Sequence, residues 1–283
     1  MVHQGDHQMQ NTEDDSKAIR LQRAVLWAKE AGKKTLNHFQ KTDLVVERKE
    51  DNSPVTIADQ EAEQFLRQKI TEEFPDDALI GEEYGSQEGS SGFAWILDPI
   101  DGTKSFISGV PLYGTLVGVT YREEPILGVI YLPGLEEGIY AATGQGAWHF
   151  KENSRPSKVN VSTKTKLSEA VFVTSQIDTF SRRGASMVFE ELQKEARVTR
   201  TWGDCYGYFL VATGRADFMV DPIMNIWDAA PMLTILQEAG GHFIDWQGEA
   251  TIETGEGLAT NGLLKDSILE ITKQAPPLTP KTV

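Results

Sequence analysis

Ala-Trp-Ile-Leu-Asp-Pro-Ile-Asp-Gly-Thr, residues 94–103, is an apolar run that ends in two carboxylates, a glycine and a threonine. The run is short, compatible with a β-strand and bounded by Pro and Gly, which predicts a buried strand. Pro99 disfavours helix at Asp98, so we expect the Asp98 carboxylate at the end of this strand, clear of the sheet.

The turn after this strand predicts an anion site. If a short helix begins near Ser105, the amides of Gly102 and Thr103 are free donors for an anion. Carboxylates beside such donors require a cation, and hard oxygen ligands favour magnesium or manganese. The stretch therefore predicts a metal and phosphate site at the tip of a strand.

The composition narrows the class of protein. The 283 residues fit one large domain or two small ones, and the net charge of -15 argues against a nucleic-acid partner. Cys205 is the only cysteine, so a reducing compartment is the simpler interpretation. The sequence has no apolar span of bilayer length and no secretory or transit pattern. We therefore expect a cytoplasmic protein with no membrane partner.

The N-terminal part is expected to begin with a tail and two helices. Residues 1–16 are polar and acidic, which predicts a loose tail, and residues 17–39 show the apolar spacing of an amphipathic helix. Residues 49–56 form a charged, turn-prone stretch, and a second helix is expected over residues 57–74.

Acidic residues recur at the ends of these elements. Asp59 lies in the first turn of the second expected helix, after Thr56 as a cap. A short strand at residues 78–80 ends at Glu82, which repeats the pattern seen at Asp98. Taken alone, Asp59 is also explained as an acid that favours the helix dipole.

The remaining chain divides into a meander and an alternating half. Antiparallel strands are expected at residues 114–121, 125–132 and 137–142, followed by a hairpin turn at 144–148 and a polar boundary at 152–157. Beyond it, short strands alternate with helices, as in an α/β unit. We therefore expect an α+β half over residues 17–155 and an α/β half over residues 156–283.

Three further acids, Asp204, Asp221 and Asp228, lie at element ends in the second half. Asp228 taken singly is again explained as a helix N-terminal acid, and Asp204 as a helix N-cap. If Glu82, Asp98, Asp101 and Asp228 converge, their mutual repulsion requires cations to hold them together. Sequence alone leaves that convergence open.

Four motifs together resemble the inositol monophosphatase family of magnesium-dependent, lithium-sensitive phosphatases. They are Val55–Asp59, Gly81–Glu83, Asp98–Thr103, and Trp227–Ala230 with Gly240 and Gly241, and the resemblance covers residues 17–271. The resemblance implies an α/β protein with a layered αβαβα sandwich of the inositol monophosphatase and fructose-1,6-bisphosphatase type, usually as a homodimer.

The resemblance also implies roles for single residues. Metal ligands would be Glu82, Asp98, the Ile100 carbonyl, Asp101 and Asp228, which together would hold two magnesium ions, with a third reached by Glu82 through water. Catalytic residues would be Asp59, Glu82 and Thr103, and phosphate would bind the amides of Gly102 and Thr103. Substrate contacts would be Asp101, Asp204, Asp221 and Asp228. A metal-activated water would attack the phosphate ester directly.

Within the family, the sequences at residues 101–109 and 203–208 resemble the histidinol-phosphate phosphatase branch. Histidinol phosphate carries an ammonium and an imidazole, so Asp204 and Asp221 would offer charge-assisted acceptors. The alternatives are an inositol-1-monophosphatase, a phosphatase of adenosine bisphosphate or of a sugar phosphate, and a non-catalytic regulatory binding protein.

Overall fold

The computed structural model describes residues 3–49 and 53–278, with side chains from Asp14 onward; residues 1–2, 50–52 and 279–283 lie outside the described part. Its helices are α1 (His3–Thr35), α2 (Ile57–Glu73), α3 (Thr103–Ile107), α4 (Asp178–Arg182), α5 (Ser186–Glu195), α6 (Asp204–Ala212), α7 (Ile226–Glu238) and α8 (Lys265–Thr272). Its strands are β1 (Val46–Arg48), β2 (Pro54–Thr56), β3 (Ala78–Gly81), β4 (Gly85–Gln87), β5 (Phe93–Asp101), β6 (Gly114–Tyr121), β7 (Glu124–Leu132), β8 (Glu137–Ala142), β9 (Ala147–Lys151), β10 (Ser157–Val159), β11 (Val171–Val173), β12 (Val198–Arg200), β13 (Phe218–Asp221), β14 (His242–Ile244) and β15 (Gly257–Thr260).

The first large sheet has eight strands in the order β10-β9-β8-β7-β6-β5-β3-β4. Its pairs are antiparallel except β3 and β5, which run parallel. Apolar side chains from α1 and α2 cover one face of this sheet, and α6 and α7 cover the other. The expected meander is confirmed as β6, β7 and β8, and the expected turn joins β8 to β9.

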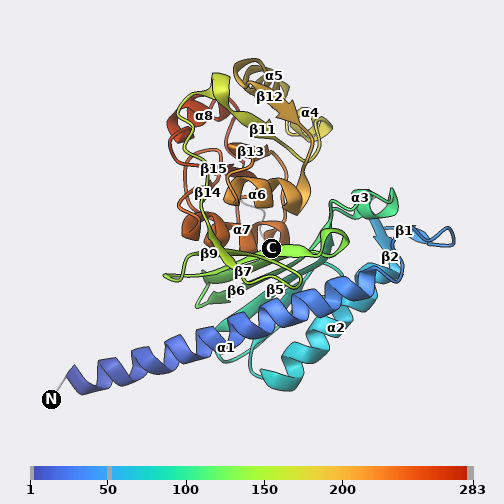
Figure 1. Ribbon diagram of the computed structural model, residues 1–283, viewed down its shortest axis with the longest axis vertical. Helices are drawn as coiled ribbons and strands as arrows, with labels where there is room; N and C mark the ends of the chain where they lie inside the picture. The colour runs from blue at the N-terminus through green and yellow to red at the C-terminus, as the bar shows by residue number, and fades with distance from the viewer. Residues whose placement is uncertain (1–2, 50–52, 279–283) are drawn as a thin grey trace.

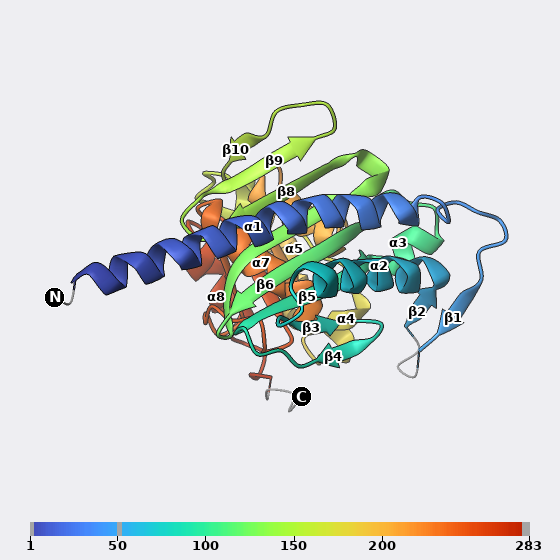
Figure 2. The ribbon, with the colours of Figure 1, turned by 90° about the horizontal axis from the view of Figure 1, so that it is seen from below.

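The second large sheet has five strands in the order β12-β11-β13-β15-β14. Helices α6 and α7 lie between the two sheets, and α4, α5 and α8 pack on the outer face of the second one. Figures 1 and 2 show the resulting layers: helices, sheet, helices, sheet, helices. The predicted αβαβα sandwich is confirmed.

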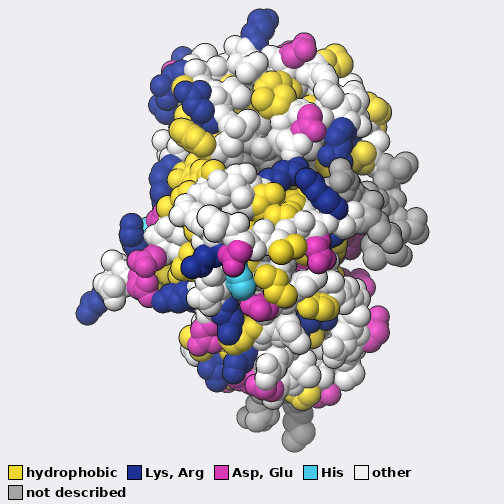
Figure 3. Space-filling model, turned by 90° about the vertical axis from the view of Figure 1, so that its right-hand side faces the viewer, with side chains coloured by type: hydrophobic (Ala, Val, Ile, Leu, Met, Phe, Trp, Pro, Cys, Tyr) yellow, Lys and Arg dark blue, Asp and Glu magenta, His cyan; other side chains and the backbone are white. Residues whose placement is uncertain are grey.

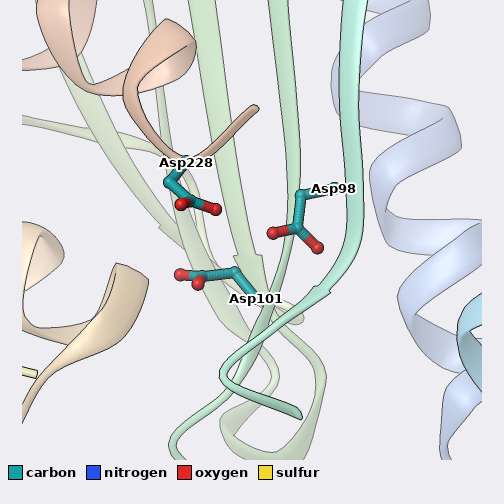
Figure 4. Close-up of side chains that lie close together, drawn as sticks. All are labelled: Asp98, Asp101 and Asp228. Carbon is teal, nitrogen blue, oxygen red and sulfur yellow. The ribbon is translucent and has the colours of Figure 1, made fainter. Parts of the chain in front are cut away.

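Strand β5 delivers the acids that the sequence singled out. It continues through Asp101, beyond the expected end at Asp98, but its register with β6 shifts between these two residues. Pro99 has no amide hydrogen to donate to the ladder, so regular pairing is interrupted there. At this irregularity the carboxylates of Asp98 and Asp101 both point toward Asp228 (Figure 4).

The expected loose tail at residues 1–16 is not loose where the structure describes it. From His3 onward these residues are the first part of α1, which projects beyond the body of the molecule (Figure 1). Once the packed part of α1 has nucleated the helix, each further residue adds a hydrogen bond, and no proline interrupts it.

Two further boundaries differ from the sequence-based expectation. The described part of the stretch at residues 49–56 contributes β2, which pairs with β1 in an antiparallel ribbon. Residues 157–159, which were assigned to the second half without an expected strand, form β10, which pairs with β9 and so extends the first sheet. The three residues of β10 pair with an edge that would otherwise be free, and the local composition of the sequence does not reveal this pairing.

A buried ion pair fastens α1 to this sheet. Arg20 donates to both oxygens of Asp77 at 2.9 and 2.8 Å, and Asp77 also accepts from Trp95 Nε1 at 2.8 Å and Ser91 Oγ at 2.6 Å. The Arg20 guanidinium lies 3.7 Å from the centre of the Phe93 ring.

We expect Asp77→Ala to lower the free energy of unfolding by about 3 kcal/mol, because it leaves the Arg20 charge buried without its partner. The aromatic contact of Arg20 remains, which keeps the loss at the lower end of the range for broken buried pairs. Urea unfolding measures the change. Glu73→Ala removes an exposed pair with Arg23 and is the control, expected to cost at most about 1 kcal/mol. Equal losses in the two variants would contradict the prediction.

Candidate active site

Three carboxylates meet where β5 ends and α7 begins. One oxygen from each of Asp98, Asp101 and Asp228 lies within 4.8 Å of the other two, and Figure 4 shows the side chains pointing toward one another. The convergence that the sequence left open is therefore observed for these three acids.

A backbone amide orients each of the three side chains. Ile100 N donates to Asp98 Oδ1 at 3.0 Å, and Asn225 N donates to Asp228 Oδ2 at 2.8 Å. Cys205 N, in the first turn of α6, donates to Asp101 Oδ2. Asp228 thus completes the capping box of α7 and also faces the cluster, so its two interpretations are compatible.

The cluster gathers buried acids that disfavour one another's charge. Burial raises the pKa of Asp98 well above its usual range, and Glu82, Asp101 and Asp228 raise it further. Burial, Asp204 and Asp228 likewise raise the pKa of Asp101. Close, desolvated carboxylate oxygens of this kind fit a divalent cation that prefers oxygen ligands, such as magnesium.

Glu82 lies beside the cluster at the end of β3. It lines the same cleft as Asp101 and Asp228 and raises the pKa of both Asp98 and Asp228. Lys49 Nζ donates to Glu82 Oε1 at 2.7 Å and to Glu83 Oε1 at 2.8 Å. The lysine is therefore part of the acidic site rather than a solvated loop charge.

Thr103 and Asp59 meet at the start of α3. Thr103 Oγ1 lies 3.1 Å from the Ile100 carbonyl oxygen and 3.5 Å from Asp59 Oδ1. Asp59 also accepts from the Thr56 amide and hydroxyl at 2.7 and 2.6 Å in the capping box of α2. Burial raises the pKa of Asp59 to about 6. Its role at the helix terminus and its contact with Thr103 therefore coexist.

The turn before α3 depends on a glycine. Gly102, the N-cap of α3, has a φ of 89°, a backbone conformation that side chains rarely adopt. A Cβ there would lie 3.1 Å from Asp204 Oδ2 and 3.3 Å from the Leu112 carbonyl. Glycine therefore lets the backbone turn tightly where the amides of residues 102 and 103 are needed.

A cleft of about 480 Å³ opens over these residues, where the end of β5 and α3 face the first turns of α6 and α7. Asp204 and Asp221 both line it, as do the apolar side chains of Val110, Ile223 and Met224. The cleft thus combines acids with an apolar wall.

Asp204 is not a side-chain cap. Gly203 is the N-cap of α6, no side chain makes a capping hydrogen bond there, and Asp204 has a φ of 52°. Burial and then Asp221 raise the pKa of Asp204 to about 6, against a lowering by Lys104. The interpretation of Asp204 as a plain N-cap is therefore wrong, and its side chain lies in the lining of the cleft.

Asp221 lies deeper and is fully bonded. Its two oxygens accept from Thr174 Oγ1, Ser175 N, Ser175 Oγ and Tyr208 OH at 3.1, 2.9, 2.8 and 3.0 Å. These four bonds use the acceptor positions of a carboxylate. Ser175 Oγ also accepts from Asp204 N at 2.8 Å, so Asp221 supports Asp204 through a residue that sequence reasoning missed.

We expect the metal-free protein to become less stable as the pH rises from about 4 to about 7. Burial raises the pKa of Asp228 to about 7 and those of Asp204 and Asp59 to about 6, from an ordinary value of 3.8. In that window the folded state binds more protons than the unfolded state, so the free energy of unfolding falls with rising pH. Thermal unfolding in chelator at pH 5.5 and 7.5 measures this, and a higher Tm at pH 7.5 would contradict it.

The layered α/β sandwich and its carboxylate cluster beside a glycine turn are typical of metal-dependent phosphomonoesterases. The chain belongs to the inositol monophosphatase family, whose sequence profile matches residues 18–276.

Individual relatives support the same family. A histidinol-phosphatase of Chlorobaculum parvum is 42% identical over 255 residues, which cover 89% of this chain and 96% of the relative. A histidinol-phosphatase of Mycobacterium tuberculosis is 35% identical over 249 residues, covering 88% and 96%. The solved structure of an IMPase of Thermotoga maritima matches with a TM-score of 0.79 at 31% identity, covering 90% of this chain and 97% of that one. Among the described residues, no helix combines the length and apolar character needed to cross a bilayer.

Proposed function

We propose that this protein is a magnesium-dependent phosphatase that hydrolyses L-histidinol phosphate to L-histidinol and phosphate, a step of histidine biosynthesis. The similarity to two histidinol-phosphatases supports this substrate. The observation that carries it is the buried carboxylate of Asp204. It lies beside the turn at Gly102, and among the described residues it has no basic partner at hydrogen-bond distance.

In this proposal Glu82, Asp98 and the Ile100 carbonyl hold one magnesium ion, and Asp98, Asp101 and Asp228 hold a second. A third, weaker ion would be reached by Glu82 through water. Bound magnesium supplies Lewis acidity, which activates a water molecule and offsets charge on the leaving oxygen. The converging carboxylate oxygens and their raised pKa values support this ligand set.

Thr103 and Asp59 orient the attacking water. The Thr103 hydroxyl has one hydrogen and two acceptors within reach, the Ile100 carbonyl and Asp59. If the carbonyl is a metal ligand, the hydrogen turns to Asp59 Oδ1, and the Thr103 oxygen can accept a hydrogen bond from the attacking water. The amides of Gly102 and Thr103 would bind the phosphate oxygens.

The leaving alcohol would lie toward the apolar wall of the cleft. Asp204 pairs with a cationic group of the alcohol, while Asp221 acts by holding Ser175 and, through it, the Asp204 backbone. Asp101 and Asp228, which also line the cleft, would accept hydrogen bonds from donor groups of the leaving alcohol. A pocket of this chemistry suits an amino alcohol better than a polyol.

Asp204→Asn should lower kcat/KM for histidinol phosphate by about ten- to a hundredfold. This factor corresponds to the loss of a charge-assisted hydrogen bond that contributes about 1.5–3 kcal/mol. Glycerol 2-phosphate should be affected much less, because its leaving group carries no cation. Steady-state kinetics on both substrates measure the difference, and equal losses would mean that Asp204 shapes the site rather than pairs with substrate.

Asp221→Asn is the matched comparison. An amide in place of the carboxylate faces donors on both of its sides, so Ser175 and the Asp204 backbone should shift. We therefore expect similar losses for both substrates.

One substrate panel decides among the alternatives. It compares histidinol phosphate, inositol 1-phosphate, adenosine bisphosphate and fructose bisphosphate at saturating magnesium. The highest kcat/KM should belong to histidinol phosphate; a preference for inositol phosphate would favour the activity named for the Thermotoga maritima relative. Absence of phosphate release from every substrate would favour a non-catalytic binding protein.

We also propose a cytoplasmic homodimer that is inhibited by lithium and binds no nucleic acid. The resemblance to the family supports the homodimer and the lithium inhibition, and the single cysteine, Cys205, supports a reducing compartment such as the cytoplasm. The net charge of -15 argues against nucleic-acid binding. On the face shown in Figure 3, Lys and Arg side chains are scattered among acidic and uncharged ones.

A further inference from the structure

The chain segment that carries Glu82 is held from behind by a buried acid on α2. Glu63 is fully buried in the middle of that helix. Its Oε2 accepts from Glu83 N at 2.7 Å, and its Oε1 accepts from Tyr84 N at 3.2 Å. A carboxylate thus binds the two successive amides that follow Glu82.

The other contacts of Glu63 lock it in this position. Arg67, one turn along α2, donates from Nε to Glu63 Oε1 at 2.7 Å and from Nη2 to the Gly85 carbonyl. A Cβ on Gly81 would lie 2.1 Å from Glu63 Oε1, so only glycine allows this approach. Glu63 and Arg67 therefore clamp the turn at both ends.

Glu82 lies between two fixed points. On one side its own amide donates to the Leu97 carbonyl of β5 at 3.2 Å. On the other side the next two amides are bound by Glu63. The backbone of Glu82 is consequently set by the β-ladder and by α2 together, while Lys49 contacts only its side chain.

We propose that Glu63 is a positioning residue that fixes Glu82 for magnesium binding, an inference that rests on the proposed function. Residues that orient a metal ligand from outside the coordination shell typically contribute ten- to a hundredfold in metal affinity. Glu63 touches neither substrate nor metal in this arrangement and acts only through the turn.

The test is magnesium titration of the metal-free full-length protein by calorimetry, with Glu63→Gln as the first variant. All donors around Glu63 are N–H groups, so the Gln amide nitrogen must face one of them and the turn must shift. We expect the Kd for magnesium to rise about ten- to a hundredfold. At saturating magnesium, the KM for substrate should stay at its original value.

Glu61→Gln is the matched control, since it makes the same chemical change at a half-exposed position of the same helix. It should leave the Kd for magnesium unchanged. Arg67→Met distinguishes a positioning effect from an electrostatic one. Removing a cation near the site would by itself tighten magnesium binding. Loss of the contacts of Arg67 with Glu63 and the Gly85 carbonyl should instead weaken magnesium binding. Arg67→Met also decides the matter if Glu63→Gln fails to fold.

A Glu63→Gln protein with a lower Tm and the original Kd for magnesium would overturn the inference, as would tighter binding by Arg67→Met. Both results are compared with the unmodified protein, which is expected to bind magnesium and to release phosphate in the same measurements. If the unmodified protein did neither, the proposed function itself would fail, and this inference with it.

Discussion

Asp101→Asn is expected to lower kcat at saturating magnesium by about a thousandfold, because a loss of about 4 kcal/mol of transition-state stabilisation corresponds to that factor. Asp101 is one of the three converging acids and lies beside the glycine turn. The Asn carbonyl oxygen can still accept from Cys205 N, which binds Asp101 Oδ2, so the local fold should persist. Phosphate release measures the loss.

The same variant should be more stable than the original protein when both are free of metal. Burial, Asp204 and Asp228 all disfavour the charge on Asp101, and the substitution removes that charge. We therefore expect a higher Tm in chelator together with a smaller rise in Tm on adding magnesium. Asp43→Asn, an exposed surface change, serves as control. Near-normal turnover by Asp101→Asn would mean that Asp101 is not a needed ligand.

The sequence predicted helices and strands correctly where the pattern lies in neighbouring residues. The apolar run before Asp98 predicted β5, and the helix expected over residues 57–74 begins at Ile57. Local patterns of this kind depend on neighbouring residues, whose relation the chain fixes directly. The order of strands in each sheet was available only through the family resemblance.

The meeting of Asp228 with Asp98 and Asp101 could not be derived from spacing. It depends on α7 packing between two sheets, with its N-terminus directed at the end of β5. Each acid has a sufficient local explanation, since Asp59 and Asp228 both complete capping boxes. Only the tertiary fold adds the second role.

Two supporting networks were missed for different reasons. Ser175 links Asp221 to Asp204 across loops distant in sequence, and nothing in the sequence signals this link. Glu63 did leave a signal: Asp59, Glu63 and Arg67 recur every four residues and so share one face of α2. An acid on that face that is followed by an arginine one turn later indicates a buried ion pair rather than a solvated surface charge.

Removal of divalent metal is expected to abolish activity, and added magnesium to restore it. Without a cation the carboxylates of Asp98, Asp101 and Asp228 repel one another. Calcium should inhibit, because it prefers looser coordination with more ligands than a compact site offers, and lithium should inhibit as in the family. Phosphate release in chelator, followed by titration with each ion, measures all three.

Binding should also be visible without turnover. A ligand that binds only the folded state at a hundred times its Kd stabilises that state by about 2.7 kcal/mol, so magnesium should raise the Tm of the chelated protein. The rise should be larger at pH 7.5 than at pH 5.5, because protons compete with the metal for carboxylates whose pKa values reach about 7, as at Asp228. Asp101→Asn should lose most of the rise at either pH. Full activity in chelator, or a Tm indifferent to magnesium, would show that these acids are gathered for another purpose.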